Sequence, residues 1–123
     1  MGVPILEHGD VLIASVQDAL TDRELLQLRQ DLVRSVGERR ARGVVIDVMA
    51  LDVMDSFACA TLRNIATAIH LRGARTVVVG IQPDVAFAMV QLGLALPNTA
   101  TALDLTDGLA LLKPEAPSSS GGR

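Results

Sequence analysis

Three side chains that could take part in polar chemistry stand close together in this chain: Asp52, Asp55 and Ser56. Two neighbouring carboxylates could bind Mg²⁺ or act as an acid and base couple. A serine beside them could act as a nucleophile or accept a phosphate group. A simpler interpretation is that Asp55 or Ser56 caps a helix, with Asp52 in the preceding turn. Capping, modification or binding, and catalysis all stay open at this point.

The rest of the chain offers little support for catalysis at Ser56. A nucleophilic serine needs a base within reach, and both histidines, His8 and His70, lie in segments unrelated to it. The sequence contains no G-x-S-x-G elbow and no glycine-rich phosphate loop. The histidines lack the spacing of metal ligands, and Cys59 is the single cysteine. We therefore expect no enzymatic activity, no metal and no cofactor.

The composition disfavours several kinds of partner. The formal net charge is -3 and only 2% of the residues are aromatic, with no Trp or Tyr. A surface that binds nucleic acid needs positive charge or stacking rings, so we expect no nucleic-acid partner. No apolar run reaches the length of a membrane span, and no basic and apolar leader begins the chain. We expect a cytoplasmic protein with no membrane partner.

The segments around Ser56 predict a single α/β domain. A nearly continuous β-branched run precedes it, which is typical of a strand covered on both faces, and an alanine-rich helical pattern follows it. Such a strand-to-helix connection is where open α/β sheets place their functional groups. The full pattern predicts strands over residues 5–7, 11–16, 44–48, 76–79 and 100–103, and helices over 22–36, 56–71, 83–92 and 105–112.

These elements give a mixed sheet of four to five strands packed with about four helices. We expect residues 1–113 to fold and the Pro, Ser and Gly-rich residues 114–123 to form a disordered tail. Thr21 and Glu24 have the spacing of a capping box at the start of the first helix. Phe57 and Phe87 are expected to fill gaps in a core of Leu, Val, Ile and Ala.

The run Asp55-Ser56-Phe57 after a Val-Val-Ile-Asp strand resembles the STAS domains, the anti-sigma-factor antagonist family. Residues 80–86 (GIQPDVA), 92–96 (LGLAL) and 101–105 (TALDL) extend the resemblance, which covers about residues 3–113. Single-domain antagonists of this family carry a Ser-Gly-Leu-Gly run near the acceptor serine. Here Phe57-Ala58-Cys59-Ala60 stands instead, which favours the stressosome scaffolds of the family.

This resemblance implies a non-enzymatic scaffold that is phosphorylated on Ser56. It implies a large homo- or hetero-oligomeric assembly with STAS-containing sensor paralogues. It also implies a serine/threonine switch kinase that is held until the serine is phosphorylated, and a phosphatase that resets the system in a stress-response pathway. The residues expected to contact partners are Asp52, Asp55, Ser56, Phe57, Gly80, Ile81, Gln82 and Pro83.

Three alternatives remain at this stage. One is a stand-alone anti-anti-sigma factor that binds an anti-sigma-factor kinase without forming a large particle. Another is a phosphoaspartate receiver domain with Asp47 or Asp55 as acceptor. A receiver needs an acidic pair after its first strand and a late lysine, and Glu7, Asp10 and Lys113 are poorly placed for these roles. The third is a small serine hydrolase, which lacks its base.

Overall fold

A five-stranded sheet forms the framework of the computed structural model, which describes residues 3–51, 53–91 and 99–113. The strands lie in the order β1-β2-β3-β4-β5, with β1 antiparallel to β2 and the other neighbours parallel. This confirms the predicted mixed α/β sheet. The order of elements is β1 (Ile5–His8), β2 (Val11–Ser15), α1 (Asp22–Arg39), β3 (Gly43–Asp47), α2 (Ser56–Leu71), β4 (Arg75–Val79), α3 (Pro83–Gln91), β5 (Thr99–Ala102) and α4 (Leu105–Leu111).

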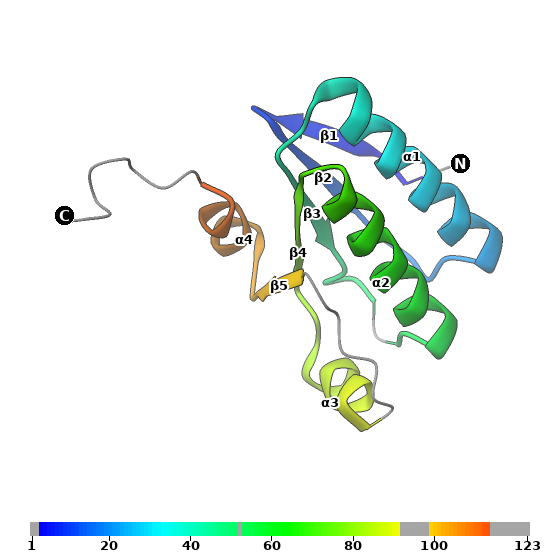
Figure 1. Ribbon diagram of the computed structural model, residues 1–123. Coiled ribbons are helices and arrows are strands. Elements are labelled where there is room, and N and C mark those ends of the chain that lie inside the picture. The colour runs from blue at the N-terminus through cyan, green and yellow to red at the C-terminus, as the bar shows by residue number, and fades with distance from the viewer. Residues whose placement is uncertain (1–2, 52, 92–98, 114–123) are drawn as a thin grey trace.

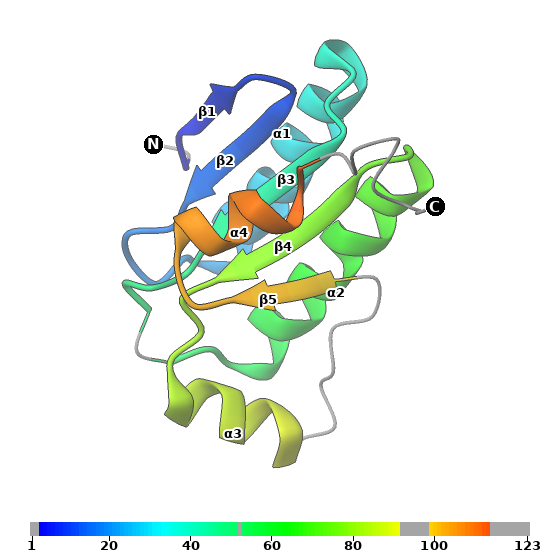
Figure 2. The same ribbon diagram turned by 90° about the vertical axis from the view of Figure 1, so that its left-hand side faces the viewer.

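Helices cover both faces of the sheet. Helices α1 and α2 lie side by side on one face, and α4 lies on the other, in front of β3 and β4 in the turned view (Figures 1 and 2). Helix α3 lies beyond the carboxyl end of β4, below the sheet in both views. Alternate residues of each central strand therefore face different helices, as in Ile46 toward α1 and α2 and Val45 toward α4.

The first helix begins where its sequence predicts. Thr21 Oγ1 accepts a hydrogen bond from the Glu24 N–H at 3.1 Å, and Glu24 Oε1 accepts one from the Thr21 N–H at 2.9 Å. This is the predicted capping box. The hydrogen bond from the Thr21 backbone lowers the pKa of Glu24. The inner side of the helix is buried at Leu25, Leu28, Leu32 and Val36, while Val33 is half-buried.

Helix α4 packs very close to the sheet because a glycine faces β4. A Cβ atom added at the buried Gly108 would lie 2.5 Å from Val79 Cγ1, so only glycine fits there without a shift. Asp104 caps this helix: its Oδ1 atom accepts a hydrogen bond from the Asp107 N–H at 2.9 Å. Leu112, which follows the helix, is buried in the core on the α4 face of the sheet.

The predicted core role of the two phenylalanines is wrong. Phe57 is 38% exposed and Phe87 is 65% exposed. The buried stripe of α2 begins only at Cys59, so Phe57 precedes it, while α3 buries Val85 and Met89 and turns Phe87 outward. Among the described residues, the core is packed mainly from aliphatic side chains, with Met54, Cys59 and Met89 filling the remaining space. Predictions for Asp52, for residues 92–98 and for the tail 114–123 lie outside the described residues.

Candidate functional site

Ser56 is the first residue of α2, directly beyond the connection that leaves β3. Its side chain is exposed, and its hydroxyl has no hydrogen-bond partner within the described part of the chain. The first N–H groups of any helix lack intrahelical acceptors and carry the positive end of the helix dipole. A free hydroxyl at this position is therefore open to modification, and a new anion there would meet unpaired N–H groups.

Asp55 is the residue that caps α2. Its Oδ1 atom accepts a hydrogen bond from the Ala58 N–H at 2.8 Å, and its carbonyl oxygen accepts one from the Cys59 N–H at 3.0 Å. The sequence left the cap open between Asp55 and Ser56. Because the aspartate takes this role, the serine hydroxyl is not needed to stabilise the helix.

The connection between β3 and α2 is held at both ends and exposes apolar side chains between them. Asp47 Oδ1 accepts a hydrogen bond from the Met49 N–H at 2.9 Å, which turns the chain as it leaves the strand. Met54 is buried in the core and anchors the other end of the connection. Between these points, Met49 is 50% exposed and Val53 is 75% exposed. Val53 and Phe57, three residues before Ser56 and one after it, place apolar surface near the serine, while Met49 adds apolar surface where the connection leaves β3.

The structure brings the predicted Gly80–Pro83 loop against this connection. Gln82 Nε2 donates a hydrogen bond to the Met49 carbonyl oxygen at 3.1 Å. Gly80 has a φ of 80° and a Cβ atom there would lie 2.7 Å from Met49 Cβ, so glycine is required by both conformation and space. Pro83 is exposed, whereas Ile81 is half-buried and packs against the core. The two segments thus form one surface, which we call the Ser56 corner: residues 49–51, 53–57 and 80–83.

The Ser56 corner contains no histidine that could act as a base. His70 lies fourteen residues along the same helix, roughly 21 Å from Ser56 along the helix axis. His8 pairs with Val11 beside the β1–β2 turn, at the opposite edge of the sheet from the start of α2. The nucleophilic interpretation of Ser56 therefore has no histidine partner in the geometry.

The receiver interpretation fails on topology. A flavodoxin-like receiver has the strand order 2-1-3-4-5, whereas the order here is sequential and begins with an antiparallel strand. Asp10 lies in the β1–β2 turn and pairs with Arg42 at 2.7 Å, at the start of β3. Asp47 lies at the other end of that strand. The acidic groups that a receiver needs together are a strand length apart.

Metal chemistry gains no support from the described residues, in which no three His, Cys, Asp or Glu side chains group closely enough to hold an ion. The suggested pair of Asp52 with Asp55 stays a prediction, because Asp52 is outside those residues. Within the same residues, no helix is long and apolar enough to cross a membrane. Burial raises the pKa of the Cys59 thiol, and the nearby Asp55 carboxylate raises it further, so this thiol stays protonated at neutral pH.

Sequence reasoning missed Met49 and Val53 as part of the candidate surface. The connection is mostly apolar, with Asp52 and Asp55 as its acidic residues, so the sequence carried no signal that Met49 and Val53 face outward while Met54 is buried. Their exposure depends on how the connection crosses the edge of the sheet, which local sequence does not reveal. The structure also shows that Ile81 contributes to packing, and any contact it makes with a partner stays a prediction.

Comparison with known proteins identifies the fold and several relatives. The model of the STAS domain family matches residues 3–104. The chain is 23% identical over 107 residues to a Bacillus subtilis protein named RsbT co-antagonist protein RsbRA, and the match covers 87% of this chain. It spans only 38% of the length of that relative. The similarity therefore concerns one domain of a longer protein.

Two solved structures are similar over nearly the whole chain. One is a serine-to-glutamate variant of RsbS from Moorella thermoacetica, with 34% identity and a TM-score of 0.80, covering 89% of this chain and 93% of the other. The second is a chain from a structure of the stressosome, described as a signal integration and transduction hub. It is 33% identical with a TM-score of 0.74 and covers 89% of this chain and 95% of the other.

Proposed function

This chain belongs to the STAS domain family, and from that premise we propose that it is a non-enzymatic scaffold of a stressosome-type assembly, in which Ser56 controls the retention of a serine/threonine kinase. The observation that carries the proposal is the exposed hydroxyl of Ser56, which has no hydrogen-bond partner among the described residues and is flanked along the chain by the exposed apolar side chains of Val53 and Phe57. In this proposal the protein acts in the cytoplasm, the bound kinase phosphorylates Ser56 and leaves, and a phosphatase restores the serine.

Electrostatics supports a switch that acts on the surface rather than on the fold. A phosphate on Ser56 adds about -1.5 to -2 charges and three acceptor oxygens. The N-terminus of α2 stabilises that anion, while the Asp55 carboxylate opposes it. A partner seated on the Ser56 corner must then accommodate a desolvated charge next to exposed apolar side chains. Such a charge weakens binding strongly unless the partner supplies a matching cation.

The similar proteins support the choice of partners. RsbRA is by name a co-antagonist of RsbT, so a protein of that kind acts together with a further antagonist. The similarity to RsbS and to a stressosome chain favours this chain as the further antagonist. We expect it to assemble with STAS-containing sensor paralogues and to hold the counterpart of RsbT.

The phosphorylation site is tested by incubating the protein with its cognate kinase and ATP and locating the phosphate by mass spectrometry. We expect one phosphate on Ser56 and none on Ser56→Ala. Thr106→Ala is the matched control, because Thr106 is also an exposed hydroxyl in the first turn of a helix capped by an aspartate. Phosphate on another residue, or undiminished phosphorylation of Ser56→Ala, would overturn the assignment.

The switch is tested by measuring how tightly the kinase is retained. Ser56→Ala should retain the kinase as the unmodified protein does. Ser56→Asp places a negative charge in the interface and should bind the kinase at least about tenfold more weakly, a loss of about 1.4 kcal/mol. Equal retention by the two variants would contradict the switch.

Native mass measurement with a sensor paralogue separates a scaffold from a stand-alone anti-anti-sigma factor: a large particle supports the scaffold, and a small discrete complex rejects it.

A further inference from the structure

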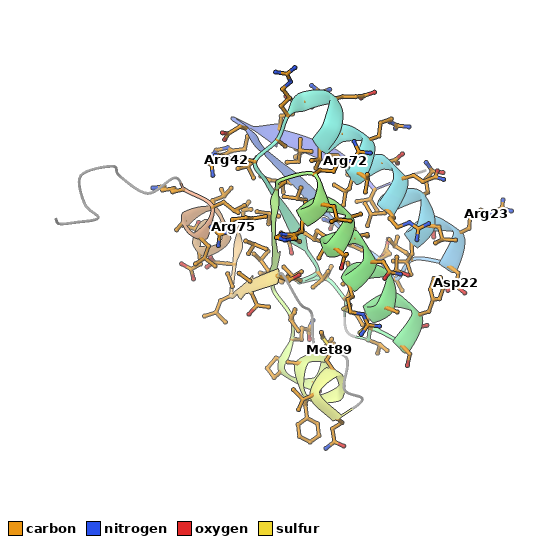
Figure 3. All side chains as sticks on the ribbon, viewed as in Figure 1. Asp22, Arg23, Arg42, Arg72, Arg75 and Met89 are labelled. Carbon is orange, nitrogen blue, oxygen red and sulfur yellow. The ribbon has the colours of Figure 1, made fainter. Side chains whose placement is uncertain are left out.

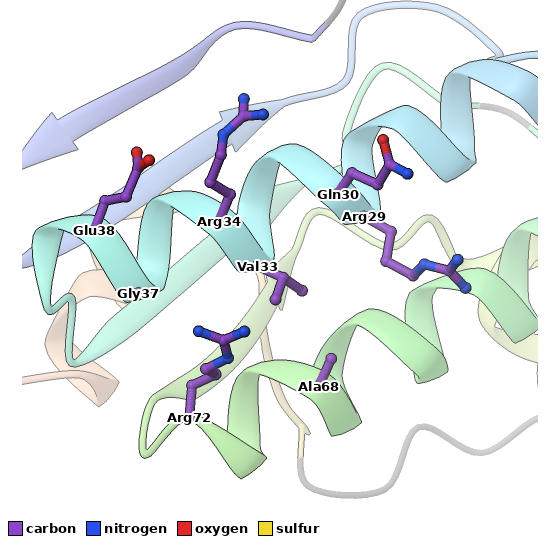
Figure 4. A pocket seen from close by; sticks show the side chains of 8 residues that line it. All are labelled: Arg29, Gln30, Val33, Arg34, Gly37, Glu38, Ala68 and Arg72. Atoms are coloured by element: carbon purple, nitrogen blue, oxygen red, sulfur yellow. The ribbon is translucent and has the colours of Figure 1, made fainter.

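An open groove of about 730 Å³ runs between α1 and α2, away from the Ser56 corner. Four of its lining residues face the space between the helices in Figure 4: Arg29 and Val33 from α1, and Ala68 and Arg72 from the C-terminal half of α2 and the residue that ends it. Arg34 and Glu38 line its outer rim and point away from α2. We call this surface the α1–α2 groove. The apolar side chains of Val33 and Ala68 lie in its middle, and the cationic side chains of Arg29 and Arg72 extend into it from the two ends.

The two arginines that face into the groove have no anionic partner in the described part of the chain. Arg34, on the rim, is paired with Asp31 at 3.1 Å. No ion pair or side-chain hydrogen bond is formed there by Arg29 or Arg72. Arg72 approaches α1 closely because position 37 is glycine: a Cβ atom there would lie 2.8 Å from Arg72 Nη1. The chain as a whole is negative, so a local excess of positive charge is a distinctive feature.

The spacing of the two guanidinium groups limits the kind of ligand. Arg29, Val33 and Gly37 lie on one stripe of α1 at intervals of four residues, and Arg72 lies against the Gly37 end. The eight residues between the ends of the stripe correspond to roughly 12 Å along the helix axis. Figure 4 shows the two guanidinium groups at opposite ends, with Val33 and Ala68 between them. One phosphate group is too small to contact both.

We propose that the α1–α2 groove binds an acidic segment of a protein partner, with two carboxylates about two helical turns apart and an apolar side chain between them. The guanidinium fork accepts a carboxylate in a bidentate geometry, which favours this chemistry at each end. Val33 and Ala68 form the apolar contact in the middle. Arg72 follows Ser56 by sixteen residues, roughly 24 Å along α2, so this surface is separate from the proposed switch.

The test uses a blocked helical peptide that carries two glutamates on one face, two turns apart, with a leucine midway. Nuclear magnetic resonance of the ¹⁵N-labelled protein should show shifts of the Arg29 and Arg72 side-chain N–H signals and of the backbone around Val33 and Ala68. Arg29→Gln with Arg72→Gln should weaken binding about fivefold to twentyfold, as expected for two exposed ion pairs. Gly37→Gln keeps the net charge, fills the groove beside Arg72 and should also weaken binding.

Matched controls make the outcome decisive. Arg23→Gln with Arg40→Gln removes the same charge from exposed positions at the two ends of α1 and should change the affinity by less than about twofold. A peptide with glutamine in place of both glutamates should not bind. Equal weakening by the control pair, or tighter binding of inorganic phosphate than of the peptide at the same residues, would overturn the proposal. Ser56→Asp should bind the peptide normally, so this result is independent of the proposed switch.

Discussion

At the scale of single residues, Asp55 is the side chain that leaves Ser56 free by capping α2 in its place. Asp55→Ala removes the acceptor of the Ala58 N–H, so we expect the free energy of unfolding to fall by about 1 kcal/mol, whereas Asp55→Asn retains most of it. Urea unfolding followed by circular dichroism measures both. Asp18→Ala, at an exposed position outside any helix or strand, is the control and should change stability by less than about 0.5 kcal/mol. An equal loss in the control would reject the capping role.

Thr76 is a second residue whose contribution can be isolated. It is buried in β4, and its Oγ1 atom has no hydrogen-bond partner among the described residues. A buried hydroxyl without a partner costs about 1–3 kcal/mol. Thr76→Val keeps the β-branched shape and should therefore stabilise the protein by about 1 kcal/mol in the same unfolding assay. A clear destabilisation would instead show that the hydroxyl is hydrogen-bonded in the folded protein.

The buried thiol of Cys59 makes the free energy of unfolding depend on pH in the alkaline range. Burial raises the pKa of its thiol in the folded protein, so the protonated form is favoured there relative to the unfolded chain. The resulting stabilisation is present below the ordinary thiol pKa and is lost as the pH rises through the raised one. We expect Cys59→Ala to reduce the loss of stability at alkaline pH. A thiol reagent should label Cys59 rapidly only in denaturant, and rapid labelling of the native protein would contradict its burial.

At the scale of elements, two glycines in helices should respond in opposite ways to the same substitution. Gly108→Ala places a methyl group 2.5 Å from Val79 Cγ1 in the core, and overpacking of this kind costs about 1–3 kcal/mol. Gly37→Ala meets only the flexible end of Arg72, so the better helix propensity of alanine should stabilise α1 by up to about 1 kcal/mol. Thermal unfolding measures both changes. Equal signs would contradict the close packing of α4 on β4.

The elements themselves could be predicted largely from local sequence. Helix α2 begins and ends as the alanine-rich pattern predicts, and the capping box places the start of α1. Strand ends differ by one residue because pairing, rather than apolarity, defines them. The predicted strand 44–48 is observed over Gly43–Asp47, where Gly43 pairs with both Val11 and Arg75 in the neighbouring strands. Long-range pairing is not visible in a local window.

The candidate site was predictable only in part for the same reason. An Asp-Ser pair before a helical pattern predicts a helix start, but both residues can cap, and only the geometry selects Asp55. The contact of Met49 with Gly80 and Gln82 requires β3 and β4 to lie next to each other in parallel. The α1–α2 groove likewise depends on the packing of two helices whose facing arginines, Arg29 and Arg72, are far apart in sequence.

At the scale of the whole molecule, charge is distributed unevenly between the two edges of the sheet. Acidic residues lie at the carboxyl ends of the parallel strands: Asp47 ends β3, Asp84 lies in the first turn of α3 after β4, and Asp104 caps α4 after β5. Arg42 and Arg75 lie at the opposite ends of β3 and β4, where the Arg75 N–H donates a hydrogen bond to the Arg42 carbonyl oxygen at 3.0 Å. Figure 3 shows Arg72 at the same end of the molecule, and Asp22 and Arg23 at the other. The Ser56 corner belongs to the acidic edge. A partner that docks there is therefore expected to be basic, and phosphate strengthens an existing negative field.

The connection between β3 and α2 contributes both to the core and to the proposed switch surface. Ser56 is exposed and Met54, two residues earlier, is buried, so the same connection carries both roles. Ser56→Glu should leave the free energy of unfolding within about 0.5 kcal/mol of the unmodified protein. Met54→Ala removes buried methylene and thioether groups and should cost about 2–5 kcal/mol. Urea unfolding is compared with kinase retention on the same preparations.

We expect Ser56→Glu to lose the kinase while remaining as stable as the unmodified protein, because the added charge lies on the surface that the partner covers. Met54→Ala should lose binding only in proportion to the fraction that is unfolded. If Ser56→Glu were instead as destabilised as Met54→Ala, the negative charge would be acting through the fold of the connection rather than through the interface. If a stable Ser56→Glu variant still retained the kinase, negative charge at the Ser56 corner would not control kinase binding, and the proposed switch would be rejected.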